Sequence, residues 1–241
     1  MNPLDLGKIQ AAAAAIDYLE DGMIVGLGTG STTNHFIAML GDLVAKGFKI
    51  GAIPTSQASA RLAESLGIAL IDINQAERID VTVDGADEVD QFHNLLKGGG
   101  GALLREKIVA HATDHMVVIA DRSKRVTDLG AFPLPVEVTS FGFTITAKKI
   151  FDVLRETGCS DADVKLREAG APGRPFVTDN GNFILDCSCG HIPDAATTAQ
   201  ALNAIPGVVE NGIFLSFPHT RRTIIFGDED GVEVMGGVVG V

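Results

Sequence analysis

The chain has 241 residues, 46% of them hydrophobic and 5% aromatic, which excludes a disordered protein and allows one large domain or two unequal ones. A core with so few aromatic side chains rests on aliphatic ones, which is typical of a parallel α/β sheet. The formal net charge of −12 repels nucleic acids and anionic membrane surfaces, so we expect neither as a partner.

Short hydrophobic runs alternate with helical patterns in the first half of the chain. We expect strands at residues 23–27, 49–53, 68–73, 79–83 and 116–120, and helices at 32–43, 58–66 and 102–112. This alternation predicts a doubly wound, mostly parallel sheet. In such sheets ligands bind beyond the carboxyl ends of the strands, where distant loops meet.

The pattern changes after Gly130. Residues 132–135 are predicted to form a stiff linker, and a hairpin is predicted around Asp179-Asn180-Gly181. Helices are expected at 146–156 and 194–205, and strand-like runs at 212–217 and 223–226 return to the first sheet. We therefore expect a catalytic domain of residues 1–130 plus 215–241 and a smaller α+β domain of residues 131–214.

A glycine- and hydroxyl-rich loop, residues 26–33, follows the first predicted strand and opens a helix. Unpaired N–H groups at a helix start stabilise an anion, and glycine lets the ligand approach the backbone. The loop does not match the NTPase phosphate loop, because no lysine precedes Ser31. It also does not match the dinucleotide fingerprint, which needs glycine in place of Ser31 and an acidic residue after the second strand, where Pro54-Thr55-Ser56 stands instead. A capped glycine turn without a ligand remains the alternative.

The second motif is an acidic turn in which Asp84 ends a predicted strand and Asp87 follows three residues later. Two neighbouring carboxylates raise each other's pKa, so one stays protonated and can donate, which suits proton exchange with sugar hydroxyls. Glu88 and Asp90 do not have the spacing of a calcium loop. A surface turn held by aspartate side chains is the alternative.

The third motif is Lys97 followed by four glycines and then a helix that carries Glu106. A glycine run is entropically costly, and its amides can form an oxyanion hole beside the lysine. Apolar neighbours on the helix raise the pKa of a carboxyl group toward the range of a general base. Arg105 has similar neighbours, so this pattern alone does not select Glu106, and an exposed, ion-paired glutamate is the alternative.

Three cysteines, Cys159, Cys187 and Cys189, are too few and odd in number for a disulfide framework. Cys187, Cys189 and His191 alternate as on a strand face, but buried thiols are the better interpretation than a metal site. The helical patch at residues 11–15 is too short for a signal or a membrane span, so a cytoplasmic protein is expected.

The three motifs, in this order and at these spacings, resemble ribose-5-phosphate isomerase of the A type. Residues 120–124, 132–138, 177–182 and 203–209 extend the similarity over nearly the whole chain. The resemblance implies an aldose–ketose isomerase that interconverts D-ribose 5-phosphate and D-ribulose 5-phosphate in the non-oxidative pentose phosphate pathway, without metal or cofactor, as a homodimer or homotetramer. It also implies a Rossmann-like larger domain and a ferredoxin-like inserted one.

The resemblance assigns Glu106 as the base that moves a proton between C2 and C1 through an enediol. It assigns Asp84, Asp87 and Lys97 to the hydroxyl protons, ring opening and the oxyanion. The substrate-binding residues that it implies are Lys8, Thr29, Gly30, Ser31, Thr32, Gly85, Ala86, Gly98, Gly99, Gly100 and Lys124. The alternative from another class is a sugar-phosphate sensing module without turnover, which would not need Glu106.

Overall fold

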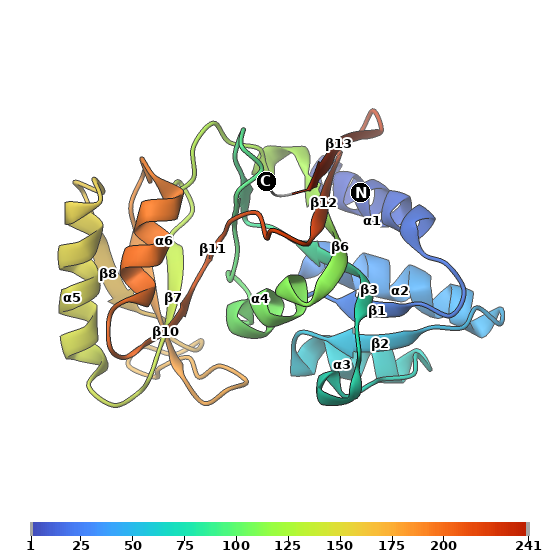
Figure 1. Cartoon of the computed structure of the whole chain (residues 1–241), viewed down its shortest axis with the longest axis horizontal. Helices are drawn as coiled ribbons and strands as arrows, with labels where there is room; N and C mark the ends of the chain where they lie inside the picture. The colour runs from blue at the N-terminus through green and yellow to red at the C-terminus, as the bar shows by residue number, and fades with distance from the viewer. Residues whose placement is uncertain (1, 240–241) are drawn as a thin grey trace. The chain divides into compact units, whose positions relative to one another are not determined.

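The structure is a computed structural model that describes residues 2–239, with side chains described up to residue 236. The chain divides into two compact units (Figure 1). The first consists of Met1–Ala86, Arg105–Lys124 and Ser216–Val241, and the second of Asp87–Leu104 and Arg125–Leu215. The division into residues 1–130 plus 215–241 and 131–214 stays a prediction about domains; the compact units differ from it mainly in where they place Asp87–Leu104.

A six-stranded sheet in the order β13-β12-β6-β3-β1-β2 forms the centre of the first unit. Its strands are β1 (Ile24–Leu27), β2 (Gly51–Pro54), β3 (Ile79–Gly85), β6 (Thr113–Asp121), β12 (Arg221–Gly227) and β13 (Val232–Val239). All neighbours are parallel except β12 and β13. The predicted mostly parallel sheet is confirmed, and the predicted run at 223–226 lies in β12 of this sheet. The prediction that residues 212–217 also return to it is wrong, because only Ile213–Phe214 form a strand there and it pairs with Leu95–Leu96 in a separate small sheet.

Helices cover both faces of this sheet. The helices are α1 (Pro3–Ala15), α2 (Ser31–Ala45), α3 (Gln57–Ser65) and α4 (Leu103–His111), with short 3-10 turns at Ile16–Tyr18, Ile73–Gln75 and Arg122–Lys124. Residues of α1, α2 and α3 share one hydrophobic cluster with β1, β3 and β6; α1 and α2 are the blue helices of Figure 1. Val109 of α4 packs in a separate cluster with Ile53 and Ile79, so α4 covers the opposite face.

The order of the strands reverses next to β1. From β1 the chain crosses to β2 on one side, and from β2 it returns to β3 on the other side. The loops that follow β1 and β3 begin at this reversal of strand order, and in sheets of this kind ligands generally bind beyond the carboxyl ends of the strands at such a point. Two of the three predicted motifs begin at this point.

The second unit contains a four-stranded antiparallel sheet in the order β10-β7-β9-β8. Its elements are β7 (Leu134–Val138), α5 (Phe143–Glu156), β8 (Asp163–Leu166), β9 (Phe183–Ser188), α6 (Ala195–Asn203) and β10 (Val208–Asn211). This chain order and sheet order are those of a ferredoxin-like fold, with α5 and α6 packed side by side (Figure 1). A smaller sheet in the same unit is formed by β4 (Glu88–Val89), β5 (Leu95–Leu96) and β11 (Ile213–Phe214).

The predicted strand at residues 68–73 is wrong. Only Leu70 forms a β-bridge, with Ala52 of β2, and a 3-10 turn begins at Ile73. The segment lies at the outer edge of β2, which is itself only four residues long, so its hydrophobic side chains pack against the sheet without a continuous ladder.

The predicted linker at residues 132–135 is also wrong in its second half, because β7 begins at Leu134. Proline is usually excluded from the inside of a sheet because it has no N–H to donate. Pro135 is tolerated because β10 pairs with β7 only from Val136 to Val138, and the Pro135 carbonyl accepts instead from the Gly212 N–H at 2.8 Å.

The predicted hairpin around residues 179–181 is present, although its first arm makes a single bridge, Val177 to Phe183. The Thr178 N–H donates to the Asn182 carbonyl at 2.9 Å. The buried Glu137 Oε1 accepts from the side chains of both residues, at 3.0 and 2.9 Å. A buried carboxylate therefore holds this turn against β7.

His115, near the start of β6, is buried in a polar cluster of the first unit. Its Nδ1 lies 2.7 Å from Nη2 of Arg221, and its Nε2 lies 2.9 Å from Oγ1 of Thr223. A guanidinium group only donates, so Nδ1 accepts and the proton sits on Nε2. Burial, and then the charge of Arg221, lower the pKa of His115 from 6.5 to about 4.

We expect this histidine to make the protein acid-sensitive. Because the folded-state pKa lies below the unfolded one, the unfolded chain binds the extra proton between pH 6.5 and about 4, and the free energy of unfolding falls as the pH falls through that range, by up to about 3 kcal/mol. Urea unfolding of His115→Gln at neutral and mildly acidic pH should show a smaller loss than wild type. The exposed His219→Gln is the control; equal losses in all three proteins would contradict the assignment.

Candidate active site

The loop after β1 is held to the end of β3 by a charged hydrogen bond. The Thr29 N–H donates to Oδ1 of Asp84 at 3.0 Å, and the Gly85 N–H donates to the same oxygen at 2.7 Å. Asp84 is fully buried. A Cβ on Gly28 would overlap the Asp84 carboxylate, so glycine is required there for the carboxylate to reach the loop.

The helix that follows this loop starts without a capping side chain. Gly30 is at the N-cap of α2 with φ 122° and ψ 173° and, within the described structure, makes no side-chain cap; this conformation suits glycine. Ser31 is exposed and Thr32 half-buried, so their amides and hydroxyls can meet a ligand, whereas Thr33 is turned into the core. The first turn of α2 thus presents partial positive charge just beyond the carboxyl end of β1.

Two hydroxyl residues of this site were not predicted from the sequence. Thr55, just after β2, lies 2.8 Å from the Thr29 hydroxyl and donates to the Leu27 carbonyl at 3.0 Å. Ser59 of α3 donates to the Gly28 carbonyl at 2.6 Å. The sequence contained one signal that could have identified Thr55. The second strand ends in Pro54-Thr55-Ser56, with hydroxyl groups at the place where a dinucleotide site would have an acidic residue. These hydroxyls brace the loop from the β2 side.

Glu106 is buried, with 4% of its surface exposed. Val109, one turn later on the same helix face, is close enough to Gly26 and Thr82 that a Cβ on Gly26 would meet both. α4 connects two parallel strands, β3 and β6, so it runs antiparallel to them and Glu106 lies nearer their carboxyl ends than Val109 does. Gly28, which directly follows β1, and Asp84, near the end of β3, lie in that direction. The exposed-glutamate alternative is therefore wrong.

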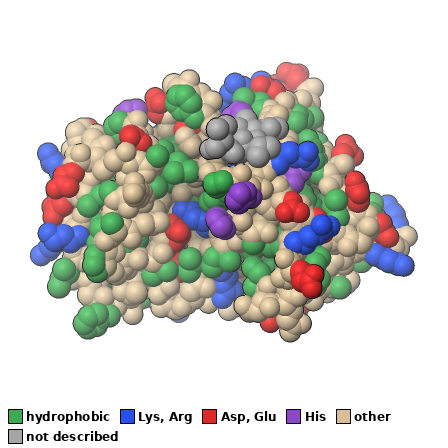
Figure 2. All heavy atoms as spheres, in the orientation of Figure 1, with side chains coloured by type: hydrophobic (Ala, Val, Ile, Leu, Met, Phe, Trp, Pro, Cys, Tyr) green, Lys and Arg blue, Asp and Glu red, His purple; other side chains and the backbone are tan. Residues whose placement is uncertain are grey.

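Two lysines supply positive charge at the same edge of the first unit. A Cβ on Gly7 of α1 would collide with the Gly227 carbonyl at the end of β12, so the neighbouring Lys8 is near the carboxyl ends of the strands. Its Nζ is 3.7 Å from Oδ1 of Asp5. Lys124 ends the 3-10 turn that follows β6 and is half-buried. On the face drawn in Figure 2, acidic and basic side chains are otherwise interspersed.

The remaining predicted residues belong to the second unit. Lys97 follows β5 and is 2% exposed, with its Nζ 5.5 Å from the centre of the Phe214 ring. The Gly99 N–H donates to Oδ2 of Asp87 at 2.8 Å, while Gly99 and Gly100 are exposed. The lysine side chain is thus buried against an aromatic ring. The Gly99 N–H is bound by Asp87, and the exposed Gly100 can present its N–H to a ligand.

The structure brings together Thr29, Gly85 and Asp84 in the first unit, and Asp87 and Gly99 in the second. Asp84 and Asp87, predicted as neighbours, are in different compact units. Asp84 accepts two backbone N–H groups, and Asp87 accepts that of Gly99.

Glu88 and Cys187, candidate metal ligands in the sequence, are engaged in the structure in ways that do not suit a metal. Glu88 accepts from the Gly130 and Phe132 N–H groups at 2.7 and 2.5 Å. Burial raises the pKa of the Cys187 thiol, which keeps it protonated and a poor ligand. Over residues 2–239, no group of three or more His, Cys, Asp or Glu side chains is arranged to hold a metal ion. In the same part of the chain, no helix combines the length and apolar character that crossing a membrane requires.

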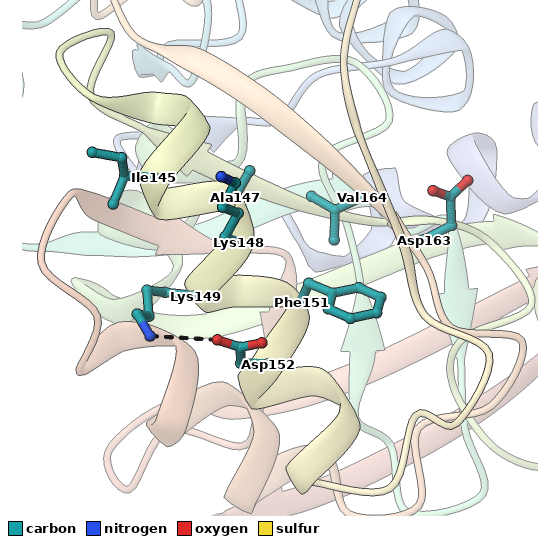
Figure 3. A pocket seen from close by; sticks show the side chains of 8 residues that line it. All are labelled: Ile145, Ala147, Lys148, Lys149, Phe151, Asp152, Asp163 and Val164. Carbon is teal, nitrogen blue, oxygen red and sulfur yellow. Dashed lines mark hydrogen bonds and ion pairs between the residues drawn. The ribbon is translucent and has the colours of Figure 1, made fainter.

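A hollow of about 520 Å³ in the second unit lies elsewhere (Figure 3). It is lined by Ile145, Ala147, Lys148, Lys149, Phe151, Asp152, Asp163 and Val164 of α5 and β8. Lys149 is paired with Asp152 at 3.4 Å (Figure 3), and much of the remaining wall is hydrophobic. Since it contains none of the predicted residues, we do not assign it to the site.

Known proteins are similar to this chain in sequence and in fold. The family model for ribose 5-phosphate isomerase A (phosphoriboisomerase A) matches residues 51–231. A ribose-5-phosphate isomerase A from Maricaulis maris is 50% identical over 228 residues, which cover 95% of this chain and 97% of the relative. One from Rhodopseudomonas palustris is 53% identical over 208 residues, 86% of this chain and 89% of the relative.

Solved structures agree. Ribose 5-phosphate isomerase A from Methanocaldococcus jannaschii superposes with a TM-score of 0.84 at 36% identity, covering 95% of this chain and 98% of that one. A D-ribose-5-phosphate isomerase in complex with phospho-erythronic acid gives 0.86 at 38% identity, covering 98% and 100%. By sequence and by fold, this chain belongs to the ribose 5-phosphate isomerase A family.

Proposed function

We propose that this chain interconverts D-ribose 5-phosphate and D-ribulose 5-phosphate, with Glu106 as the base. The observation that carries the proposal is its similarity, over 95% of its length, to a relative named ribose-5-phosphate isomerase A. The buried position of Glu106 supports catalysis over the sensing alternative, because binding a sugar phosphate does not need a buried carboxylate beside the ligand.

Glu106 moves the proton that changes carbon. Its carboxylate removes the proton from C2 of the open aldose, and the electrons form a C1–C2 double bond with negative charge on O1. The resulting carboxylic acid then returns the proton to C1, while the hydroxyl proton moves from O2 to O1 and leaves the ketone at C2. A base with so little exposed surface loses protons slowly to water, which favours return to the substrate.

A second group of residues acts on the substrate oxygens, by stabilising negative charge and exchanging hydroxyl protons. Lys97 and the amides after it stabilise the charge that develops on O1, since a positioned donor acts most strongly on charge that appears in the transition state. Asp84 and Asp87 exchange hydroxyl protons and assist ring opening. Gly85, Ala86 and Gly98 allow close contact of the substrate with the backbone.

The phosphate is bound by residues 29–32, at the end of the loop and the start of α2, with Lys8 and Lys124. The helix dipole and the unpaired amides favour an anion, and the two lysines offset locally the repulsion from a net charge of −12. A solved relative in complex with phospho-erythronic acid supports a phosphorylated, sugar-like ligand. No metal or cofactor is expected in the reaction.

Substitution of the base gives the first test. Glu106→Gln should lower kcat by about 10³-fold or more, because a general base acts in the transition state, while binding of phospho-erythronic acid changes by less than about tenfold. Ketose formation is measured in the presence of EDTA, and calorimetry measures binding. The control is Glu64→Gln in α3, an exposed glutamate. Turnover that survives Glu106→Gln would refute the role of Glu106, whereas an inactive wild type would refute the isomerase itself.

Removal of a phosphate contact should act differently. Lys124→Ala should raise KM about tenfold or more with kcat nearly unchanged, since a contact made equally in ground and transition states affects binding alone. Lys46→Ala, an exposed lysine just after α2, is the control. A fall in kcat at constant KM would place Lys124 in the chemical step instead.

We also propose that the enzyme is a cytoplasmic homodimer or homotetramer, as the family resemblance implies. Sedimentation velocity should give a mass of two or four times 25.2 kDa, and cell fractionation should place the protein in the cytoplasm. A monomer at the concentrations used for assays would contradict the assembly.

A further inference from the structure

Arg167, directly after β8, joins the glycine loop to the ferredoxin-like sheet. Its Nε and Nη2 donate to the two carboxylate oxygens of Asp186 on β9, at 2.9 and 2.5 Å. Its Nη1 donates to the carbonyls of Gly98 and Gly99, at 3.0 and 3.1 Å. All of these residues are in the second unit, and none of the roles assigned above uses Arg167.

The surroundings of the arginine hold its guanidinium group in place. The backbone of Arg167 pairs on both sides, its N–H with the Ile184 carbonyl and its carbonyl with the Phe176 N–H, each at 2.8 Å. The guanidinium carbon lies 5.8 Å from the centre of the Phe176 ring. The side chains of Arg167 and Asp186 are only 14% and 28% exposed. A bidentate pair of this kind fixes both the position and the plane of the guanidinium.

This arrangement determines where the loop amides point. In a trans peptide the C=O and N–H groups point in opposite directions, and the peptides of the loop are trans. The Gly98 carbonyl is bound by Arg167, and the N–H of that same peptide, which belongs to Gly99, donates to Asp87 at 2.8 Å. By the same geometry, the Gly99 carbonyl on Arg167 turns the Gly100 N–H away from the arginine.

The glycine loop needs such a restraint. Glycine loses more conformational freedom on ordering than any other residue. Gly98 and Gly101 have φ of +108° and +81°, and a Cβ on Gly99 would be 2.8 Å from Oδ1 of Asp87. Side chains that would stiffen the loop are therefore excluded by its own geometry. A cation on two carbonyls can order the loop instead, and it also polarises the attached N–H groups toward stronger donation.

We propose that Arg167, held by Asp186, is a positioning residue for the isomerisation: it orients the Gly99 N–H toward Asp87 and the Gly100 N–H toward the oxyanion. This inference rests on the proposed function of Asp87 and of the loop amides. Arginine is required because three of its nitrogens act at once, two on the carboxylate and one on the carbonyls, whereas a lysine ammonium is a single point.

The test compares Arg167→Lys and Arg167→Met with Lys165→Met as a matched control. Lys165 is two residues earlier, in β8, 76% exposed and paired with Asp163. We expect both Arg167 variants to lose about 10- to 100-fold in kcat, with KM changed less than about threefold, because oxyanion stabilisation is a transition-state effect. Addition of guanidinium ion to Arg167→Met should restore part of kcat. The control should keep wild-type kcat.

A second measurement does not depend on activity. In the amide NMR spectrum, the Gly99 N–H of wild type should exchange slowly with solvent because it is bound by Asp87, and this protection should be lost in Arg167→Met. Normal Gly99 behaviour and unchanged kcat in that variant would overturn the proposal, as would a lowered melting temperature with unchanged kcat, which is a purely structural role. If wild type shows no isomerase activity, the proposed function fails, while the Gly99 signal still reports whether Arg167 orients the loop.

Discussion

The hydrogen bond from the Thr29 N–H to the Asp84 carboxylate is the interaction on which the candidate site depends. It connects the loop after β1 with the end of β3, at the point where the strand order reverses. A buried carboxylate is costly unless it is hydrogen-bonded, and the backbone N–H groups of Thr29 and Gly85 both donate to its Oδ1. The start of α2, where we propose that the phosphate binds, and the acidic group are therefore fixed by one interaction, and Gly28 is small because the carboxylate occupies the space of its missing Cβ.

In the second unit, charged side chains likewise hold the backbone through hydrogen bonds, and Arg167 does so while it is paired with Asp186. Asp87 accepts an N–H of the glycine loop, Arg167 donates to its carbonyls, and Glu88 holds the segment at Gly130. Charge-assisted hydrogen bonds are stronger than neutral ones and keep their direction. A loop of four glycines can thus combine close access for a ligand with a defined orientation of its amides.

Local patterns predicted the helices and most of the strands. α2, α5 and α6 have hydrophobic residues at helical spacing, and Gly30 marks the start of α2, so their positions follow from neighbours in the sequence. The predictions failed where the neighbouring strand decides whether a segment forms a strand. Pro135 lies in a strand because the facing ladder has ended, and residues 68–73 are not a strand because the edge of β2 is short.

Composition, periodicity and the three motifs by themselves determined the mostly parallel sheet and the α+β elements after it, and they predicted a phosphate-binding loop beside carboxylates. Only the tertiary structure showed that Glu106 is buried, that Ser59 braces the loop at Gly28, and that Arg167 reaches Gly98. These last two contacts join residues 31 and 69 positions apart. The order in which strands lie side by side creates such contacts, and no local spacing encodes that order.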